Sequence, residues 1–512
     1  MATSLIRGKY VICKVTSRTH AEVITDGAVV QRDGAIIDVG SYEDLAARYQ
    51  PDDVLGSAEH VVMPGLVNSH HHVGLTPFQL GSPDYPLELW FASRLGARPV
   101  DPYLDTLYSA FEMIASGVTT VQHLHGWRIG PAARVLAVAD QILKAYRDLG
   151  MRVSYSFALR DQNRLVYEAD DQFLTRLPPP LAAELATWFQ AQSLSCQENL
   201  DIFTQLWERW NQHERIRIQL APANLHWCSD AALQALQTYA TQYGVGMHMH
   251  LLETAYQKEY AHRRTSTTAV RHLYDRGLLG PHMTLGHGVW LTEDDIELVA
   301  ATGTMICHNA SSNLRLRSGV APVNHFLARG VRVALGLDEA GINDDRDMLQ
   351  EMRLVLRLHR VPGMEDVVPT APQVLQMATE HGAQTTGFAQ TIGTIAPGKA
   401  ADLVVMDWHQ IAYPYLEPGT SIVDAVVHRG KTSGVETVLV AGEPVLRDGQ
   451  FTRINKADVL ADLATSLQVP LSPDEARRQQ LARDIFPHVQ HFYDGWLDES
   501  AREPFYRPSA RR

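Results

Sequence analysis

The sequence predicts an α/β protein in which a TIM-like (β/α)8 barrel is flanked by a small β-sandwich domain built from both chain ends. Between residues 61 and 389, short apolar runs alternate with amphipathic segments, as expected for parallel strands joined by helices. Residues 1–60 and 390–455 instead alternate apolar and polar positions, as expected for short antiparallel strands. Residues 456–512 are predicted to form a helical C-terminal extension.

The barrel is predicted from a count of its strands. Eight is the strand number of this barrel class, whose active sites lie at the carboxyl ends of the strands. One connection, residues 163–213, is unusually long, which favours either a lid or pocket wall, or an extra helical hairpin packed outside the barrel or against a second subunit. The eight candidate strands are residues 65–70, 118–123, 153–159, 216–222, 245–250, 283–287, 304–308 and 331–338.

The two chain ends share one kind of turn signal. Asp26-Gly27 and Asp33-Gly34 separate strand-like runs near the N-terminus, and Asp448-Gly449 does so near the other end. We therefore expect both ends to pair in one small domain beside the barrel. After Asn455 the chain becomes helical and closes with an aromatic, arginine-rich tail, interpreted as a subunit or domain contact or as a frayed end.

Composition limits the classes of partner. The 512 residues are 45% hydrophobic and 20% charged, which is ordinary for a soluble globular protein. The net charge of −13, without any basic run, argues against a nucleic-acid partner or an anionic membrane surface. The four cysteines lack disulfide-framework or CxxC spacing, and no apolar stretch of about 18 residues could span a membrane. We expect a cytoplasmic homo-oligomer that binds a small neutral or cationic molecule.

Histidines two residues apart follow the first predicted barrel strand. Because alternate side chains on a strand leave the same face, His70 and His72 can converge on one metal ion. The 23 histidines predict roughly one such pair by chance, and the chain has three. The motifs that accompany a pair therefore decide whether it is a candidate metal site. That context is an ordered series: a His-x-His after a Pro-Gly turn, then a strand ending in HxxE, one ending in GH and one ending in GLD.

In this order the sequence resembles the amidohydrolase superfamily, and within it the cytosine/guanine and triazine deaminase-like branch. The resemblance covers nearly the whole chain and rests on the segments PGLVNSHHH, HLLE, GHGVWL, ASSNLRLRSG and IGTIAPGKAADLVVMD. It implies a barrel with a returning small domain, and it selects His250 over His248 because His250 precedes Glu253 by three residues. The implied metal ligands are His70, His72, His250 and Asp338.

The catalytic roles follow from the same positions. Asp338 would bind the ion and take a proton from the attacking water, and Glu253 would shuttle protons to the substrate. His287 would hydrogen-bond the attacking water or the developing oxyanion. The fourth strand, residues 216–222, ends without a Lys or Glu to bridge two ions, so one divalent ion is expected. Zinc suits three imidazoles and a carboxylate, with ferrous iron as the alternative.

Several residues just past strand ends are candidate substrate contacts. Glu339 follows Asp338 where the family commonly has glycine, and it would face the bound ring or turn outward to an arginine such as Arg346. A carboxylate facing the ring would accept hydrogen bonds from ring N–H or amino groups. The other candidates for substrate binding are Gln79, Trp90, Arg160 and Asn309.

The residues and the resemblance together predict a metal-dependent aminohydrolase that releases ammonia from an amino-substituted purine, pyrimidine, pterin or triazine-like ring. Glu253 would protonate the ring nitrogen, and water activated by the ion would attack the adjacent carbon. The ligands do not specify the leaving group, so hydrolysis of another C–N, C–Cl or C–S bond in a heterocycle or urea is the alternative. A non-catalytic scaffold of the same fold is a third hypothesis, and the complete set of ligands argues against it.

Overall fold

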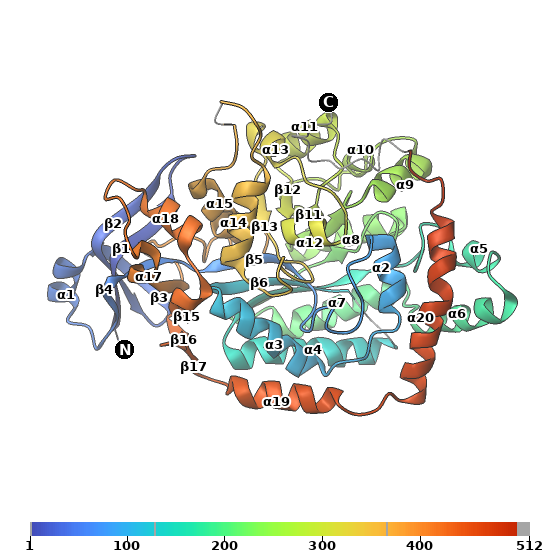
Figure 1. Cartoon of the computed structure of the whole chain (residues 1–512), viewed down its shortest axis with the longest axis horizontal. Coiled ribbons are helices and arrows are strands. Elements are labelled where there is room, and N and C mark those ends of the chain that lie inside the picture. Colours follow the sequence, from blue (N-terminus) through green and yellow to red (C-terminus); the bar gives the residue numbers. More distant parts are fainter. Residues whose placement is uncertain (1–2, 127–129, 365–366, 499–512) are drawn as a thin grey trace.

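The computed structural model describes residues 3–126, 130–364 and 367–498 (Figure 1). Strands from both chain ends form one eight-stranded sheet in the order β17-β16-β15-β14-β4-β1-β2-β3. The two ends meet where β4 and β14 pair antiparallel, with Pro64 opposite Leu403. The strands of this sheet are β1 (Thr3–Val15), β2 (Ala21–Arg32), β3 (Ala35–Ser41), β4 (Asp53–Pro64), β14 (Leu403–Asp407), β15 (Val435–Val440), β16 (Glu443–Arg447) and β17 (Gln450–Phe451).

The remaining strands are parallel and form two further sheets. One contains β5 (Leu66–His71), β6 (Val118–His125), β7 (Arg152–Leu159), β8 (Ile216–Ile218) and β9 (Ala221–Pro222). The other contains β10 (Met247–Leu251), β11 (Met283–His287), β12 (Met305–His308) and β13 (Val333–Leu335). Isolated parallel bridges link the two sheets at both seams, from Leu220 to Met247 and from His71 to Asp338. The predicted strand positions agree closely with these bounds at six of the eight strands. The run 216–222 is divided between β8 and β9, and the predicted strand 331–338 is shortened to Val333–Leu335, so Asp338 lies three residues past its end.

Helices alternate with the parallel strands, and their ends follow from local sequence. In α8, for example, the Ser229 side chain accepts a hydrogen bond from the Ala232 N–H, and Gly244 ends the helix with a φ of +63°. The helices are α1 (Tyr42–Tyr49), α2 (Leu87–Arg94), α3 (Pro102–Ala115), α4 (Ala132–Leu149), α5 (Asp170–Leu174), α6 (Pro179–Ala191), α7 (Cys196–Trp210), α8 (Asp230–Tyr243), α9 (Ala255–Thr265), α10 (Ala269–Asp275), α11 (Glu293–Thr302), α12 (Ala310–Arg315), α13 (Val323–Ala328), α14 (Met348–Leu358), α15 (Ala371–Ala378), α16 (Glu380–Gln384), α17 (Trp408–Ala412), α18 (Ile422–Arg429), α19 (Lys456–Leu467) and α20 (Pro473–Phe492).

A buried ion pair ties the parallel strands to the mixed sheet. Arg152, at the start of β7, donates from Nη2 to Asp402 Oδ1 at 2.8 Å and from Nε to Oδ2 at 2.9 Å. Both side chains are only 2% exposed. Because a buried charge left without its partner costs about 3–5 kcal/mol, this contact fixes the position of the segment before β14 relative to β7.

The long connection of residues 163–213 contains α5, α6 and α7. Leu185 and Phe189 of α6 pack in one apolar cluster with Ile485 and Val489 of α20. Figure 1 shows α20, in red, running beside α6 and α2. Part of the long connection therefore packs against the C-terminal helix, outside the parallel strands, and the end of the predicted aromatic tail lies outside the described residues.

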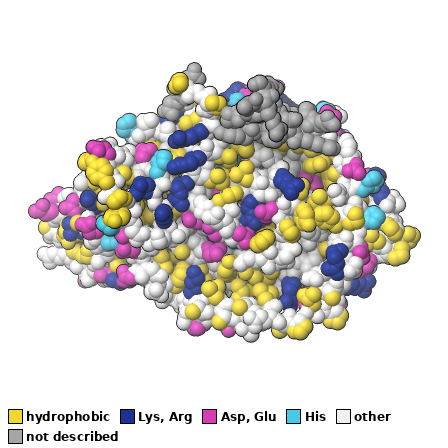
Figure 2. All heavy atoms as spheres, viewed as in Figure 1, with side chains coloured by type: hydrophobic (Ala, Val, Ile, Leu, Met, Phe, Trp, Pro, Cys, Tyr) yellow, Lys and Arg dark blue, Asp and Glu magenta, His cyan; other side chains and the backbone are white. Residues whose placement is uncertain are grey.

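The surface mixes charge types. Figure 2 shows one face of the molecule, on which basic and acidic side chains are interspersed among hydrophobic ones. Within the part of the chain that the structure describes, no helix is both long enough and apolar enough to cross a membrane.

Candidate metal centre and active site

Three imidazoles meet at the carboxyl ends of β5 and β10. The Nε2 atom of His70 lies 3.0 Å from Nε2 of His72 and 3.1 Å from Nε2 of His250. The His72 and His250 Nε2 atoms are 3.0 Å apart. On the far side of two rings, His72 Nδ1 donates to the Leu124 carbonyl at 2.5 Å and His250 Nδ1 donates to the Ala223 carbonyl at 2.8 Å. These donations leave Nε2 of both rings with a lone pair that points into the cluster.

A carboxylate completes the cluster. Asp338 Oδ1 lies 3.0 Å from His72 Nε2 and 3.5 Å from His70 Nε2. The Ser312 hydroxyl donates to Asp338 Oδ2 at 2.5 Å. Burial alone would raise the pKa of Asp338, but the close approach of His72 and His287 and the hydrogen bond from Ser312 hold that pKa below its ordinary value. Imidazole lone pairs facing one another beside an ionised carboxylate form a donor set that fits one divalent cation.

Glu253 and His287 lie beside this cluster. Glu253 Oε2 is 3.7 Å from His287 Nε2, which in turn is 4.0 Å from Asp338 Oδ2. Burial raises the pKa of Glu253 well above its ordinary value, and the charges of Asp338 and Glu88 raise it further. Glu253 is therefore disposed to hold a proton that it can give to a bound molecule.

His287 has a fixed orientation. Its Nδ1 lies 2.8 Å from the Asn313 side-chain oxygen, to which it donates, and the Asn309 amide lies 3.3 Å from Nε2. Burial lowers the pKa of His287, so its neutral form is favoured. In that form Nε2 is an acceptor, which suits an O–H group of water better than an oxyanion.

A cavity of about 480 Å³, including its open mouth, adjoins these side chains. Aromatic rings from α2 and from the segment between β9 and α8 form part of its wall, so a flat ring can be covered on its faces. The lining residues are His72, Leu87, Trp90, Phe91, Gly126, Arg160, Asn224, Trp227, His250, Glu253, Gln257, His287, Leu316, Asp338 and Glu339.

The predicted substrate contacts divide into two groups. Trp90, Arg160 and Glu339 line the cavity. Gln79 does not, because its side chain accepts from the Thr76 N–H at 2.8 Å and donates to the Tyr108 hydroxyl at 3.1 Å, which shapes a turn. Asn309 also lies outside the lining; it is fully buried and contacts the His287 ring.

Glu339 has a different partner from the one considered for it. Its Oε1 lies 2.9 Å from Arg94 Nη1, and the Arg94 guanidinium is 4.6 Å from the centre of the Trp90 ring. Arg346 instead donates to the carbonyls of Val73 and Gly74. The other Glu339 oxygen is buried and has no hydrogen-bond partner among the described residues. Glu339 is therefore part of the cavity lining and does not turn outward to Arg346.

Sequence reasoning missed other functional candidates. Phe91 and Trp227 line the cavity, and the signal for Phe91 was its place directly after Trp90. Asn313, which lies in the segment ASSNLRLRSG, contacts the His287 ring directly. No sequence pattern singled out Glu88. Its side chain is 3% exposed and accepts hydrogen bonds from the Thr254 hydroxyl at 2.6 Å and the Tyr167 hydroxyl at 2.8 Å.

Three imidazoles, a carboxylate and a buried glutamate brought together near the carboxyl ends of parallel strands are typical of a metal-dependent hydrolase. The chain belongs to the amidohydrolase family, whose model matches residues 61–445.

Individual relatives are similar over most of the chain. The 5-methylthioadenosine/S-adenosylhomocysteine deaminase of Nitratidesulfovibrio vulgaris is 29% identical over 458 residues, covering 88% of this chain and 94% of the relative. The 5′-deoxyadenosine deaminase of Methanosarcina mazei is 29% identical over 467 residues, covering 90% and 97%. A zinc-bound adenosine deaminase structure from Xanthomonas campestris superposes with a TM-score of 0.77 at 24% identity, covering 94% of this chain and 99% of that one. The chain is a hydrolase of carbon–nitrogen bonds.

Proposed function

We propose that the protein is an aminohydrolase that releases ammonia from an amino-substituted N-heterocycle, with one zinc ion held by His70, His72, His250 and Asp338. The observation that carries this proposal is the convergence of the three imidazole nitrogens and the Asp338 carboxylate within 3.5 Å of His70 Nε2. The adenine-containing substrates in the names of two relatives make adenine nucleosides the first compounds to test.

The chain's own residues supply the proton transfers. When bound, the ion supplies a Lewis acid that makes water a nucleophile near neutral pH. The protonated Glu253 donates to a ring nitrogen, which makes the adjacent amino-bearing carbon electrophilic. Asp338 accepts a proton from the attacking water and is held in place by Ser312. His287 orients that water through the lone pair on Nε2.

The cavity wall selects a flat ring with hydrogen-bond donors. Trp90, Phe91 and Trp227 provide aromatic faces, and the Arg160 guanidinium lies 3.7 Å from the centre of a Trp227 ring. Glu339 keeps one carboxylate oxygen for a ring N–H or amino group. Because an anionic ring would meet this carboxylate unfavourably, the expected substrate is neutral or cationic.

We propose that the two parallel sheets close into one (β/α)8 barrel over residues 61–389, supported by the bridges from Leu220 to Met247 and from His71 to Asp338. Residues 1–60 and 390–455 then form the small β-sandwich domain, supported by the shared eight-stranded sheet.

A coupled ammonia assay with the zinc-replete enzyme tests the proposal. The panel contains adenosine, 5′-deoxyadenosine, guanine, cytosine, a pterin and an aminotriazine, and parallel samples are analysed for chloride, alkylamine and thiol release. Ammonia from at least one aminated ring, at a rate that zinc removal abolishes, is the expected result. Release of another leaving group without ammonia would contradict the aminohydrolase assignment and favour the hydrolysis of a C–Cl, C–S or different C–N bond.

A further inference from the structure

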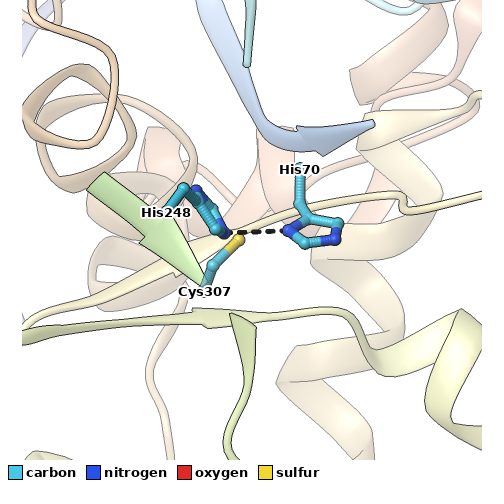
Figure 3. A group of neighbouring side chains, drawn as sticks. All are labelled: His70, His248 and Cys307. Carbon is cyan, nitrogen blue, oxygen red and sulfur yellow. Dashed lines mark hydrogen bonds between the residues drawn. The ribbon is translucent and has the colours of Figure 1, made fainter. Parts of the chain in front are cut away.

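A second buried cluster lies behind His70. Figure 3 shows His248 and Cys307 pointing toward the His70 ring, from the strands β10 and β12. The Nδ1 atom of His70 is 2.9 Å from Nε2 of His248. All three side chains are fully buried. The two nitrogens of the His70 ring therefore face two different environments: Nε2 faces the metal cluster and Nδ1 faces His248.

Two glycines make room for this arrangement. A Cβ atom added at Gly286 would lie 3.0 Å from His70 Cε1 and 3.4 Å from His248 Nε2. A Cβ atom added at Gly336 would lie 2.5 Å from His70 Cβ. A side chain at Gly286 would therefore crowd the His70 and His248 rings, and one at Gly336 would displace the base of the His70 side chain, so the neighbouring strands are built around this contact.

His70 differs from the other two histidines in the partner of its Nδ1 atom. His72 and His250 donate to backbone carbonyls, which no substitution of a side chain removes. Nε2 of His70 must carry a lone pair to bind the ion, so its proton lies on Nδ1 and His248 Nε2 must accept it. The tautomer of His70 thus depends on one replaceable side chain.

We propose that His248 is a positioning residue for the metal centre: by accepting the hydrogen bond from His70 Nδ1, it fixes the tautomer and the ring plane of His70. This inference rests on the proposed metal site. His248 would not bind the ion itself and would act on it only through the orientation of His70. Imidazole ligands of metals commonly use such a second hydrogen bond, and its loss typically weakens metal binding by about 10- to 100-fold.

The cluster itself is a poor metal site. A metal would require the Cys307 thiolate, but Cys307 Sγ lies 3.5 Å from the Asn309 side-chain oxygen, to which the thiol donates. A metal would also compete with His70 Nδ1 for the hydrogen bond that it already makes to His248. The geometry therefore favours a hydrogen-bonded support for His70.

The test is the affinity for zinc, measured by competition with a chelator, together with thermal unfolding of the metal-free protein. In His248→Gln the amide oxygen reaches the position of Nε2, and we expect zinc affinity within a few-fold of wild type. In His248→Asn the shorter amide cannot reach it, and in His248→Leu no acceptor remains, so affinity should fall by about 10- to 100-fold in both. Cys307→Ala is the matched control within the cluster, and its zinc affinity should stay at the wild-type level.

Three outcomes would overturn the proposal. The first is wild-type zinc affinity in both His248→Asn and His248→Leu with unchanged unfolding temperatures. The second is two zinc equivalents in wild type, one of which is lost in Cys307→Ala, because the cluster would then bind metal itself. The third is a wild-type chain that binds no zinc, which would also overturn the proposed centre. A wild-type chain that binds zinc tightly but releases no ammonia would overturn only the proposed function, because the affinity assay needs no substrate.

Discussion

Glu339 and Arg94 form a buried ion pair at the wall of the active-site cavity, with Glu339 Oε1 2.9 Å from Arg94 Nη1. Glu339 directly follows Asp338, the proposed carboxylate ligand, whereas Arg94 ends α2. The pair joins the loop after β13 to the helix that carries Trp90. Since one Glu339 oxygen is held by Arg94, the orientation of the other is set before a substrate arrives.

Glu339→Gln tests whether that free oxygen binds substrate. If it accepts a hydrogen bond from the ring equally in the ground and transition states, KM should rise about tenfold or more while kcat changes little. Steady-state kinetics on the substrate that the ammonia panel yields measure both. Arg94→Gln is the matched variant, because it removes the partner and keeps the carboxylate. Unchanged kinetics in Glu339→Gln, with a lower unfolding temperature, would make the ion pair purely structural.

Replacing a metal ligand should remove metal and turnover together. Wild type should copurify with about one equivalent of zinc or iron per chain, and His72→Ala or Asp338→Ala should lose both the ion and activity, because the remaining ligands cannot complete the site. Elemental analysis of the purified protein measures the ion. Gln79→Ala is the control, since Gln79 lies outside the cavity. A double variant of His72 and Asp338 that keeps a full equivalent would refute the ligand set.

Glu253→Gln separates proton transfer from metal binding. The amide keeps the shape of the side chain but cannot release a proton to the substrate, so the rate should fall by about 10²- to 10⁴-fold. Metal content should stay normal, because Glu253 is not among the proposed ligands. Single-turnover rates and elemental analysis on the same sample report the two effects. A rate within a few-fold of wild type would place the proton shuttle elsewhere.

Glu351 gives stability a pH dependence. Burial raises its pKa from an ordinary value of 4.5 to about 7, although hydrogen bonds from Ser311 oppose the shift. Because the folded state favours the neutral carboxyl group, the stabilisation of the folded state by neutral Glu351 is fully present below pH 4.5. That stabilisation is lost as the pH rises through 7. The unfolding free energy of wild type should therefore fall by about 3 kcal/mol relative to Glu351→Gln between pH 4.5 and 8. Parallel denaturant titrations measure the difference, and curves that stay parallel across this window would contradict it.

The sequence predicted the strands well, because buried parallel strands are short apolar runs with sharp ends. It also placed the metal-ligand candidates at strand ends, since alternation along a strand fixes which side chains share a face. Contacts between side chains far apart in the sequence could not be predicted in this way. The partner of Glu339 is Arg94 and not Arg346, and no local pattern connects a loop after β13 with the end of α2. Gln79 was expected near substrate from its distance past a strand, yet its own turn holds it away.

The packing of α20 against α2 has a consequence for how the enzyme is made. Trp90 of α2 lines the cavity, Arg94 of the same helix contacts Glu339 in the cavity wall, and α20 packs against this helix (Figure 1). Tyr493, just past α20, accepts a hydrogen bond from the Tyr167 N–H, and the Tyr167 hydroxyl donates to Glu88 on α2. Because synthesis proceeds from the N-terminus, His70, His72, His250 and Asp338 are all made before α20. A nascent chain that already contains every proposed metal ligand therefore still lacks the helix that supports this part of the cavity wall.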